Sequence, residues 1–172
     1  MISLIILPMN FFDRFFNADE LAVELDLYLK LQLKENNYVI KEVLDENSTV
    51  DLKNLKEEEK FYVPTIIIFD YRERKINVID LIVYVYLCYI AYSDNNSTVK
   101  PSKKEISRKI NERKTDVEES LNFLVTLGRT LLDRNKSGYY IIDELANQEK
   151  VLGLEVLLKK EKHKYNPYGI LK

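Results

Sequence analysis

Positively charged side chains are concentrated in residues 100–115 of this sequence. Seven lysines and arginines occur there, against two acids, Glu105 and Glu112. Ammonium and guanidinium groups bind phosphate oxygens through charge and hydrogen bonds, so such a stretch could hold a nucleic-acid backbone. The alternative is the solvated face of an ordinary helix, because exposed lysines are common on helices. The phosphate contacts that we expect are Lys103, Lys104, Arg108, Lys109, Arg113 and Lys114.

The charge of the whole chain restricts where such binding can occur. The formal net charge of the 172 residues is −2, which gives no general attraction to phosphate backbones. A nucleic-acid site must therefore be local. Two hydroxyl residues, Ser102 and Thr115, border the cationic residues. We expect both to cap helices and to donate hydrogen bonds to a nucleic-acid backbone.

Few residues in this sequence are suited to catalysis, metal binding or cofactor binding. The single histidine, His163, stands in a lysine-rich segment, and the single cysteine, Cys88, stands among apolar residues, so the usual zinc ligand sets cannot form within one chain. Glycine-rich phosphate loops and nucleophile motifs do not occur. Neighbouring acids such as Asp143 and Glu144 are more readily surface groups than a general acid and base. We therefore expect no catalytic residue, no metal and no cofactor, and we do not expect an enzyme.

The elements that would position the cationic residues share one start signal. At four places a small polar residue is followed three positions later by an acid, which is the pattern of a capping box at a helix N-terminus. The acid also complements the positive end of the helix dipole. The pairs are Asn17/Glu20, Asn77/Asp80, Ser102/Glu105 and Thr115/Glu118. The last two pairs have the strict Ser/Thr-x-x-Glu form, so they predict the two helix starts nearest the cationic residues.

Residues 78–142 predict three helices and a hairpin. Their order is a central helix over 78–92, a short helix over 103–110, a tight turn through 111–114 and a longer helix over 116–127 that Gly128 ends. Residues 130–134 and 139–142 flank the turn-forming segment 135–138, which predicts a β-hairpin. Helix, helix, turn, helix and hairpin is the order of a winged helix-turn-helix domain.

Further elements flank this unit. We expect a helix over residues 18–34, a strand over 38–44, an acidic connection over 45–60, extended structure over 61–64 and 66–69, and a last helix over 144–164. The chain is thus expected to be α+β and mostly helical. The parts that we distinguish are an N-terminal helix and strand extension of residues 1–60, a winged helix-turn-helix domain of residues 61–143, and a C-terminal helix and tail of residues 144–172.

Two apolar runs raise the question of a membrane. Residues 1–16 lack a positive leading segment and a cleavage site, and residues 76–92 contain Asn77 and Asp80. We expect neither run to be a signal peptide or a membrane span. The tyrosines of the second run, which could stack on bases, are interpreted as core because they alternate with Val, Leu and Ile. A single cysteine fits a reducing compartment, so we expect a cytoplasmic protein.

Four segments between residues 61 and 142 follow a known pattern. They are the lead-in Phe61-Tyr-Val-Pro64, the apolar segment Val83-Tyr-Val-Tyr-Leu87, the helix start Pro101-Ser102-Lys103-Lys104-Glu105-Ile106, and residues 121–128. With these segments, residues 61–142, close to half of the chain, resemble the winged helix-turn-helix domains of bacterial plasmid and phage replication initiators and replisome organisers. The Pro-Ser-Lys-Lys-x-Ile segment after a loop is the most distinctive of the four.

The resemblance implies a way of docking on DNA. In such domains the second helix lies across the DNA backbone and the third enters the major groove, which would place Ser102, Lys103 and Lys104 beside phosphates. The hairpin would be the wing, with Arg134 and Lys136 near the adjacent groove or backbone.

The third helix departs from the family pattern. Its front usually offers Ser, Thr, Arg or Lys, whereas here Asp116, Glu118 and Glu119 follow Thr115. Acids that face a phosphate groove weaken binding unless they point away or accept a hydrogen bond from cytosine. Helix capping and dipole complementation are sufficient explanations for these acids, and contact with a protein partner is another.

Two functions follow from these patterns. The first is a protein that binds double-stranded DNA, of the plasmid or phage replication type or a related transcription regulator. The second is a winged-helix module for protein-protein interaction, with a replication protein as partner and no direct DNA binding. A continuous positive stripe over the second and third helices would favour DNA, and a broken one a protein. The flanking helices could also pair two copies as a homodimer.

Overall fold

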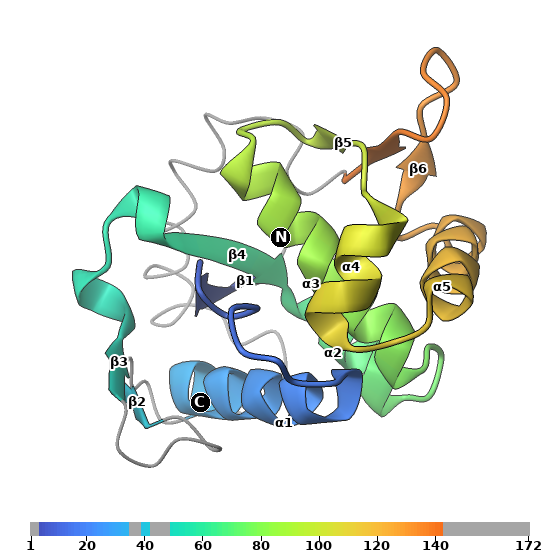
Figure 1. The fold of residues 1–172 in the computed structure, drawn as a ribbon. Coiled ribbons are helices and arrows are strands. Elements are labelled where there is room, and N and C mark those ends of the chain that lie inside the picture. Colours follow the sequence, from blue (N-terminus) through green and yellow to red (C-terminus); the bar gives the residue numbers. More distant parts are fainter. Residues whose placement is uncertain (1–3, 35–38, 42–48, 143–172) are drawn as a thin grey trace.

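A computed structural model of the chain describes residues 4–34, 39–41 and 49–142, which form an α+β fold in which helices predominate (Figure 1). The helices are α1 (Ala18–Leu29), α2 (Thr65–Arg72), α3 (Val78–Ser93), α4 (Lys103–Ile110) and α5 (Lys114–Leu127). The strands are β1 (Leu4–Pro8), β2 (Val39–Lys41), β3 (Thr49–Asp51), β4 (Lys60–Pro64), β5 (Thr98–Val99), β6 (Leu131–Leu132) and β7 (Tyr140–Ile141). A π-helical turn, Lys30–Lys34, extends α1, and two 3-10 turns, Leu52–Asn54 and Glu57–Glu59, precede β4.

Helix α3 lies at the centre of the fold. Its sequence is apolar nearly all round, and residues 81–88 are all buried. The side chain of Asn77 accepts a hydrogen bond from the amide of Asp80, and the Asp80 carboxylate accepts one from the amide of Asn77, so the predicted capping box is complete. Helices α1, α2 and α5 and strand β4 pack around α3. A helix that is hydrophobic on every side is thus covered on every side, and the central helix expected over residues 78–92 is confirmed.

The N-terminal segment joins the core through a strand pair that the sequence did not indicate. Antiparallel pairing of β1 with β4 runs from Leu4↔Pro64 to Pro8↔Lys60, and every residue of both strands is buried. Gln32 covers β1 with its amide group, which donates to the carbonyl oxygen of Ile6 and accepts from the Ile6 amide, each over 2.8 Å. The Gln32 side chain thus forms the two backbone hydrogen bonds at Ile6 that a further strand would otherwise form.

Helix α1 covers the same core. Asn17 and Glu20 form the complete capping box that the sequence predicts. Leu21, Leu25 and Tyr28 are buried at helical spacing. Together with its π-helical extension, α1 confirms the helix expected over residues 18–34.

The elements after α3 form a second group. Strand β5 is followed by α4 and α5, and then by the hairpin of β6 and β7; β7 lies between β5 and β6, and both pairings are antiparallel. Figure 1 shows α4 and α5 side by side, with the hairpin projecting beyond α5. The short helix over residues 103–110 and the hairpin are as predicted, whereas the two-residue strand β5 was not expected.

Residues 66–69 are helical, so the extended structure expected there is wrong. Pro64 ends β4 and stands at the N-cap of α2. Ile67 and Ile68 are buried while Ile66 is 40% exposed, a distribution that fits a helix and not an alternating strand. The strand preference of β-branched residues is weak, and packing of α2 on α3 overrides it.

The predicted division at residue 60 stays a prediction, but one hydrophobic core spans both sides of it, from Leu4 to Ile142. Strand β2 falls within the expected strand over residues 38–44, the rest of which lies outside the described residues, as does the expected helix over residues 144–164. No helix in the described ranges is long and apolar enough to cross a bilayer.

Candidate nucleic-acid interface

Helix α4 displays part of the cationic stretch on its outer side. Ser102 stands at the N-cap, where its hydroxyl oxygen accepts from the amide of Glu105 over 3.2 Å. Ile106 and Ile110 are buried on the inner side. Lys104 and Arg108, one helical turn apart on the opposite side, are exposed. These two cations therefore form the outward ridge of the helix.

A three-residue turn, residues 111–113, connects α4 to α5. Asn111 ends α4 in the left-handed backbone region with φ of 51°, which asparagine tolerates better than most residues. The hydroxyl of Ser107 donates to the carbonyl oxygen of Glu112, and the amide of Glu112 donates to the carbonyl oxygen of Ser107. These bonds fix the turn against α4, as a helix-turn-helix unit needs.

Helix α5 presents a mostly uncharged outer face. Val117, Leu121 and Leu124 are buried against α3 and α4. The exposed side chains on the opposite side are those of Thr115, Glu119, Asn122 and Thr126. Hydroxyl and amide groups can donate to and accept from base edges in a groove, so most of this face is suited to contact a nucleic acid.

Thr115 does not cap α5, so this sequence prediction is wrong. The helix begins at Lys114, with Arg113 at the N-cap and no side-chain capping bond. The Arg113 guanidinium instead holds Asp116 with two bonds, Nε to Oδ2 over 2.9 Å and Nη2 to Oδ1 over 3.2 Å, and this hydrogen bonding raises the pKa of Arg113. Thr115 is therefore an exposed hydroxyl in the first turn of the helix.

Three of the predicted cations are paired with carboxylates. Lys103 Nζ lies 3.3 Å from Glu118 Oε1, and Lys109 Nζ lies 3.9 Å from Asp13 Oδ1. Arg113 is held by Asp116. The positive stripe that the sequence predicts is therefore interrupted at three places, and Asp13 comes from a loop that sequence reasoning did not connect with this surface.

The other cations of the predicted set on α4 and α5 keep their charge uncompensated. Lys104, Arg108 and Lys114 are exposed, and no carboxylate of the described part of the chain forms an ion pair with them. Their ammonium and guanidinium groups are thus accessible to an anion from solution.

The hairpin brings Lys136 close to Lys100, the residue that follows β5. Lys136 Nζ lies 5.2 Å from the ring centre of Tyr139, and Lys100 Nζ lies 5.5 Å from the same ring centre. Gly138, with φ of 75°, turns the chain between Lys136 and the start of β7. One aromatic ring therefore holds two ammonium groups in the same neighbourhood.

Glu105 is exposed on α4, and its carboxylate is within hydrogen-bond reach of Tyr86 in α3. Burial, together with the charge of Glu105 and a hydrogen bond to its carboxylate, raises the pKa of Tyr86, a buried residue of α3. The phenol is therefore neutral and donates to Glu105.

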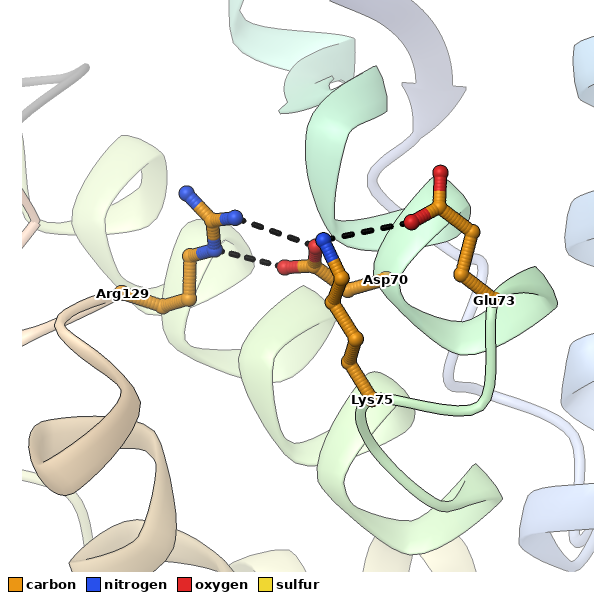
Figure 2. A network of polar contacts seen from close by, with 4 residues as sticks. All are labelled: Asp70, Glu73, Lys75 and Arg129. Atoms are coloured by element: carbon orange, nitrogen blue, oxygen red, sulfur yellow. Dashed lines mark hydrogen bonds and ion pairs between the residues drawn. The ribbon is translucent and has the colours of Figure 1, made fainter.

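An ion pair fixes the end of α5 to α2. Figure 2 shows the Arg129 guanidinium facing the Asp70 carboxylate, with Nε 2.5 Å from Oδ2 and Nη2 3.0 Å from Oδ1, beside the pair of Lys75 and Glu73 at 3.2 Å. The Asp70 side chain is 4% exposed. Because Arg129 directly follows the helix-ending Gly128, this pair fixes the direction in which the chain leaves α5 for the hairpin.

No family model, curated protein or solved structure matches the chain. In the residues that the structure describes, no group of three or more His, Cys, Asp and Glu side chains is arranged to hold a metal ion. The function of this surface must therefore be inferred from its own geometry and charges.

Proposed function

We propose that this chain binds double-stranded DNA through a winged helix-turn-helix unit formed by residues 78–142. The order α3, β5, α4, α5, β6 and β7 supports the unit, as does the packing of the hairpin on β5. In this arrangement α4 crosses the DNA backbone, α5 enters the major groove and the hairpin is the wing. The resemblance of residues 61–142 to replication initiators and replisome organisers favours a role in plasmid or phage replication.

The observation that carries this proposal is the accessible charge of Lys104, Arg108 and Lys114. These residues lie on α4 and in the first turn of α5, the two helices that face DNA in the proposed unit. Lys100 and Lys136, gathered around Tyr139, extend the charge toward the wing. Ser102 and Thr115 add hydroxyl donors at the helix starts.

The ion pairs also weaken the objection that acids of the third helix repel a phosphate groove. Asp116 is held by Arg113 and Glu118 by Lys103. Of the three acids, only Glu119 forms no ion pair among the described residues. Each pair is nearly neutral at the distance of a phosphate, so the repulsion that the sequence indicates is reduced.

A salt titration tests the proposal. The expected result is binding of a labelled random duplex at low salt, with a slope of log affinity against log salt between about −3 and −5, because about five cations release counterions at about −0.9 per contact. Undetectable binding at about 50 mM salt would overturn the proposal.

A second function, protein-protein interaction, is favoured by two observations. The positive stripe over α4 and α5 is interrupted by three ion pairs, and a broken stripe favours a protein partner. A groove of about 650 Å³ lies between α5 and the segment that leads into α3, and it is lined by Phe123, Ile79, Arg74 and Glu119 among others. Phe123 is 40% exposed there. An adaptor that used only this groove would bind a replication protein and no duplex DNA, so the same titration separates the two functions.

Homodimer formation through the flanking helices stays a prediction. Light scattering that shows a strict monomer at high concentration would contradict it.

A further inference from the structure

The loop between β1 and α1 reaches the turn between α4 and α5. The side-chain amide of Asn111 donates to the carbonyl oxygen of Phe15 over 2.8 Å. Asp13 of the same loop forms the ion pair with Lys109. Two independent contacts thus join a segment outside the proposed winged unit to the part of the unit that carries Arg113 and Lys114.

The side chain of Phe15 points away from the core. It is 88% exposed, the highest value of any large apolar side chain in the described residues. Its neighbours behave differently: Phe11 and Phe12 are buried, and Phe16 is partly buried with the Arg14 guanidinium 5.7 Å from its ring centre. The loop therefore keeps one aromatic ring in solvent while its backbone is held at a defined place.

We infer that Phe15 contacts DNA, with its ring against a deoxyribose or base at the edge of the footprint, next to the phosphate that Lys114 binds. This inference rests on the proposed function. Lys114 follows Asn111 by three residues, which limits the distance between their Cα atoms to about 11 Å. Phosphates along one strand recur about every 3.4 Å of the helix axis, so the ring lies within a few nucleotides of the phosphate that Lys114 binds. Aromatic rings bind sugars and base faces without sequence preference, whereas cations bind phosphates.

Fluorescence can test this contact directly because the chain contains no tryptophan. Phe15→Trp places a single reporter at the exposed position. Val23→Trp is the matched control, since Val23 is 52% exposed and lines a groove between α1 and α2. Duplex DNA at low salt should quench Phe15→Trp along the same isotherm as the anisotropy of the labelled duplex, and should leave Val23→Trp nearly unchanged.

Two further variants separate the contact from its positioning. Phe15→Ala should lower affinity about fivefold and leave the salt slope unchanged, because the lost contact is apolar. Asn111→Gly keeps a residue that adopts positive φ but removes the donor to Phe15, so it should reduce the quenching of Phe15→Trp. Thermal melts confirm that each variant is folded.

The outcomes distinguish this inference from the proposed function. Normal DNA binding with unchanged Phe15→Trp fluorescence would overturn the contact and leave the function standing. Failure of the unaltered chain to bind DNA would overturn both. Quenching that follows protein concentration in the absence of DNA would assign Phe15 to a contact between copies of the chain, and would also overturn the inference.

Discussion

Glu118 of α5 forms an ion pair with Lys103 of α4 within the proposed DNA surface. Substitution of this one acid therefore tests how the pair affects DNA binding. Glu118→Gln should raise duplex affinity by up to about fivefold, because an exposed ion pair is worth about 0.2–1 kcal/mol and its removal returns the charge of Lys103 to the phosphates. Anisotropy at low salt measures the change. Glu58→Gln, in a 3-10 turn before β4, is the control that should have no effect. A loss of affinity on Glu118→Gln would show that the acid itself contacts the DNA.

The unpaired cations should contribute most to phosphate binding. Lys104→Ala combined with Lys114→Ala should weaken binding to all duplex sequences alike and make the salt slope less negative by about 2, since each phosphate contact accounts for about 0.9. Lys103→Ala should have the smaller effect because Glu118 already compensates its charge.

The matched control for the double variant of Lys104 and Lys114 is Lys53→Ala combined with Lys56→Ala. Both lysines are exposed and lie in the segment that precedes β4. Unchanged binding after removal of Lys104 and Lys114, or equal loss in the control, would place the interface elsewhere on the molecule.

Between elements, the pair of Arg129 and Asp70 joins α2 to the end of α5 (Figure 2). Arg129→Ala should lower the free energy of unfolding by about 3 kcal/mol, because it leaves a nearly buried carboxylate without its partner. Urea denaturation followed by circular dichroism measures this loss. Lys75→Ala, which breaks the neighbouring exposed pair with Glu73, should cost under about 1 kcal/mol. Similar losses in both variants would contradict a special role of the Arg129 pair.

The contact of α1 with α2 depends on pH. Burial raises the pKa of Asp26, but hydrogen bonds from Lys30 and Arg72 outweigh this effect and hold the pKa below its usual 3.8. A carboxyl whose pKa is lower in the folded than in the unfolded state stabilises the fold above pH 3.8, and this contribution is lost as the pH falls through the folded-state pKa. Asp26→Asn should therefore lower the melting temperature at neutral pH. The difference from the unaltered chain should shrink as the pH falls below 3.8. A difference that stays constant as the pH falls would show that packing and not charge is responsible.

Elements with a local signal could be predicted from the sequence. Ser102 gives α4 its start, Gly128 gives α5 its end, and the uniformly apolar run of α3 predicts a covered helix. Each of these signals acts over a few residues, through a hydrogen bond to a nearby amide or through helical spacing.

Elements that depend on distant partners could not be predicted. Strand β1 exists because β4 pairs with it, and α2 is helical because it packs on α3. The pairing of Lys109 with Asp13 and the bond from Asn111 to Phe15 join loops far apart in sequence. For this reason the sequence showed which residues are cationic. It did not show which of these cations form ion pairs with carboxylates.

At the scale of the molecule, the N-terminal segment is a structural part of the proposed DNA-binding unit. Strand β1 supplies a partner to β4, α1 covers α3, and the loop between β1 and α1 is bonded to the turn between α4 and α5. A net charge of −2 remains compatible with DNA binding because the accessible cations lie on α4, at the start of α5 and on the hairpin. The acids elsewhere disfavour other orientations of the protein on the DNA.

The shared core makes a prediction about the fragment 61–142, the winged domain that the sequence delimits. Without residues 1–60, β4 loses β1, and α3 loses the cover of Leu21, Leu25 and Tyr28. Each buried side chain of this size contributes about 1.5–3 kcal/mol, so losing the contacts of even five of them approaches the 5–15 kcal/mol that stabilises a typical domain. The fragment should therefore lack a cooperative thermal transition by circular dichroism, whereas the full chain should melt cooperatively. A fragment that folds and binds duplex DNA with the affinity of the full chain would instead establish the division at residue 60, and Phe15 would then have no part in binding.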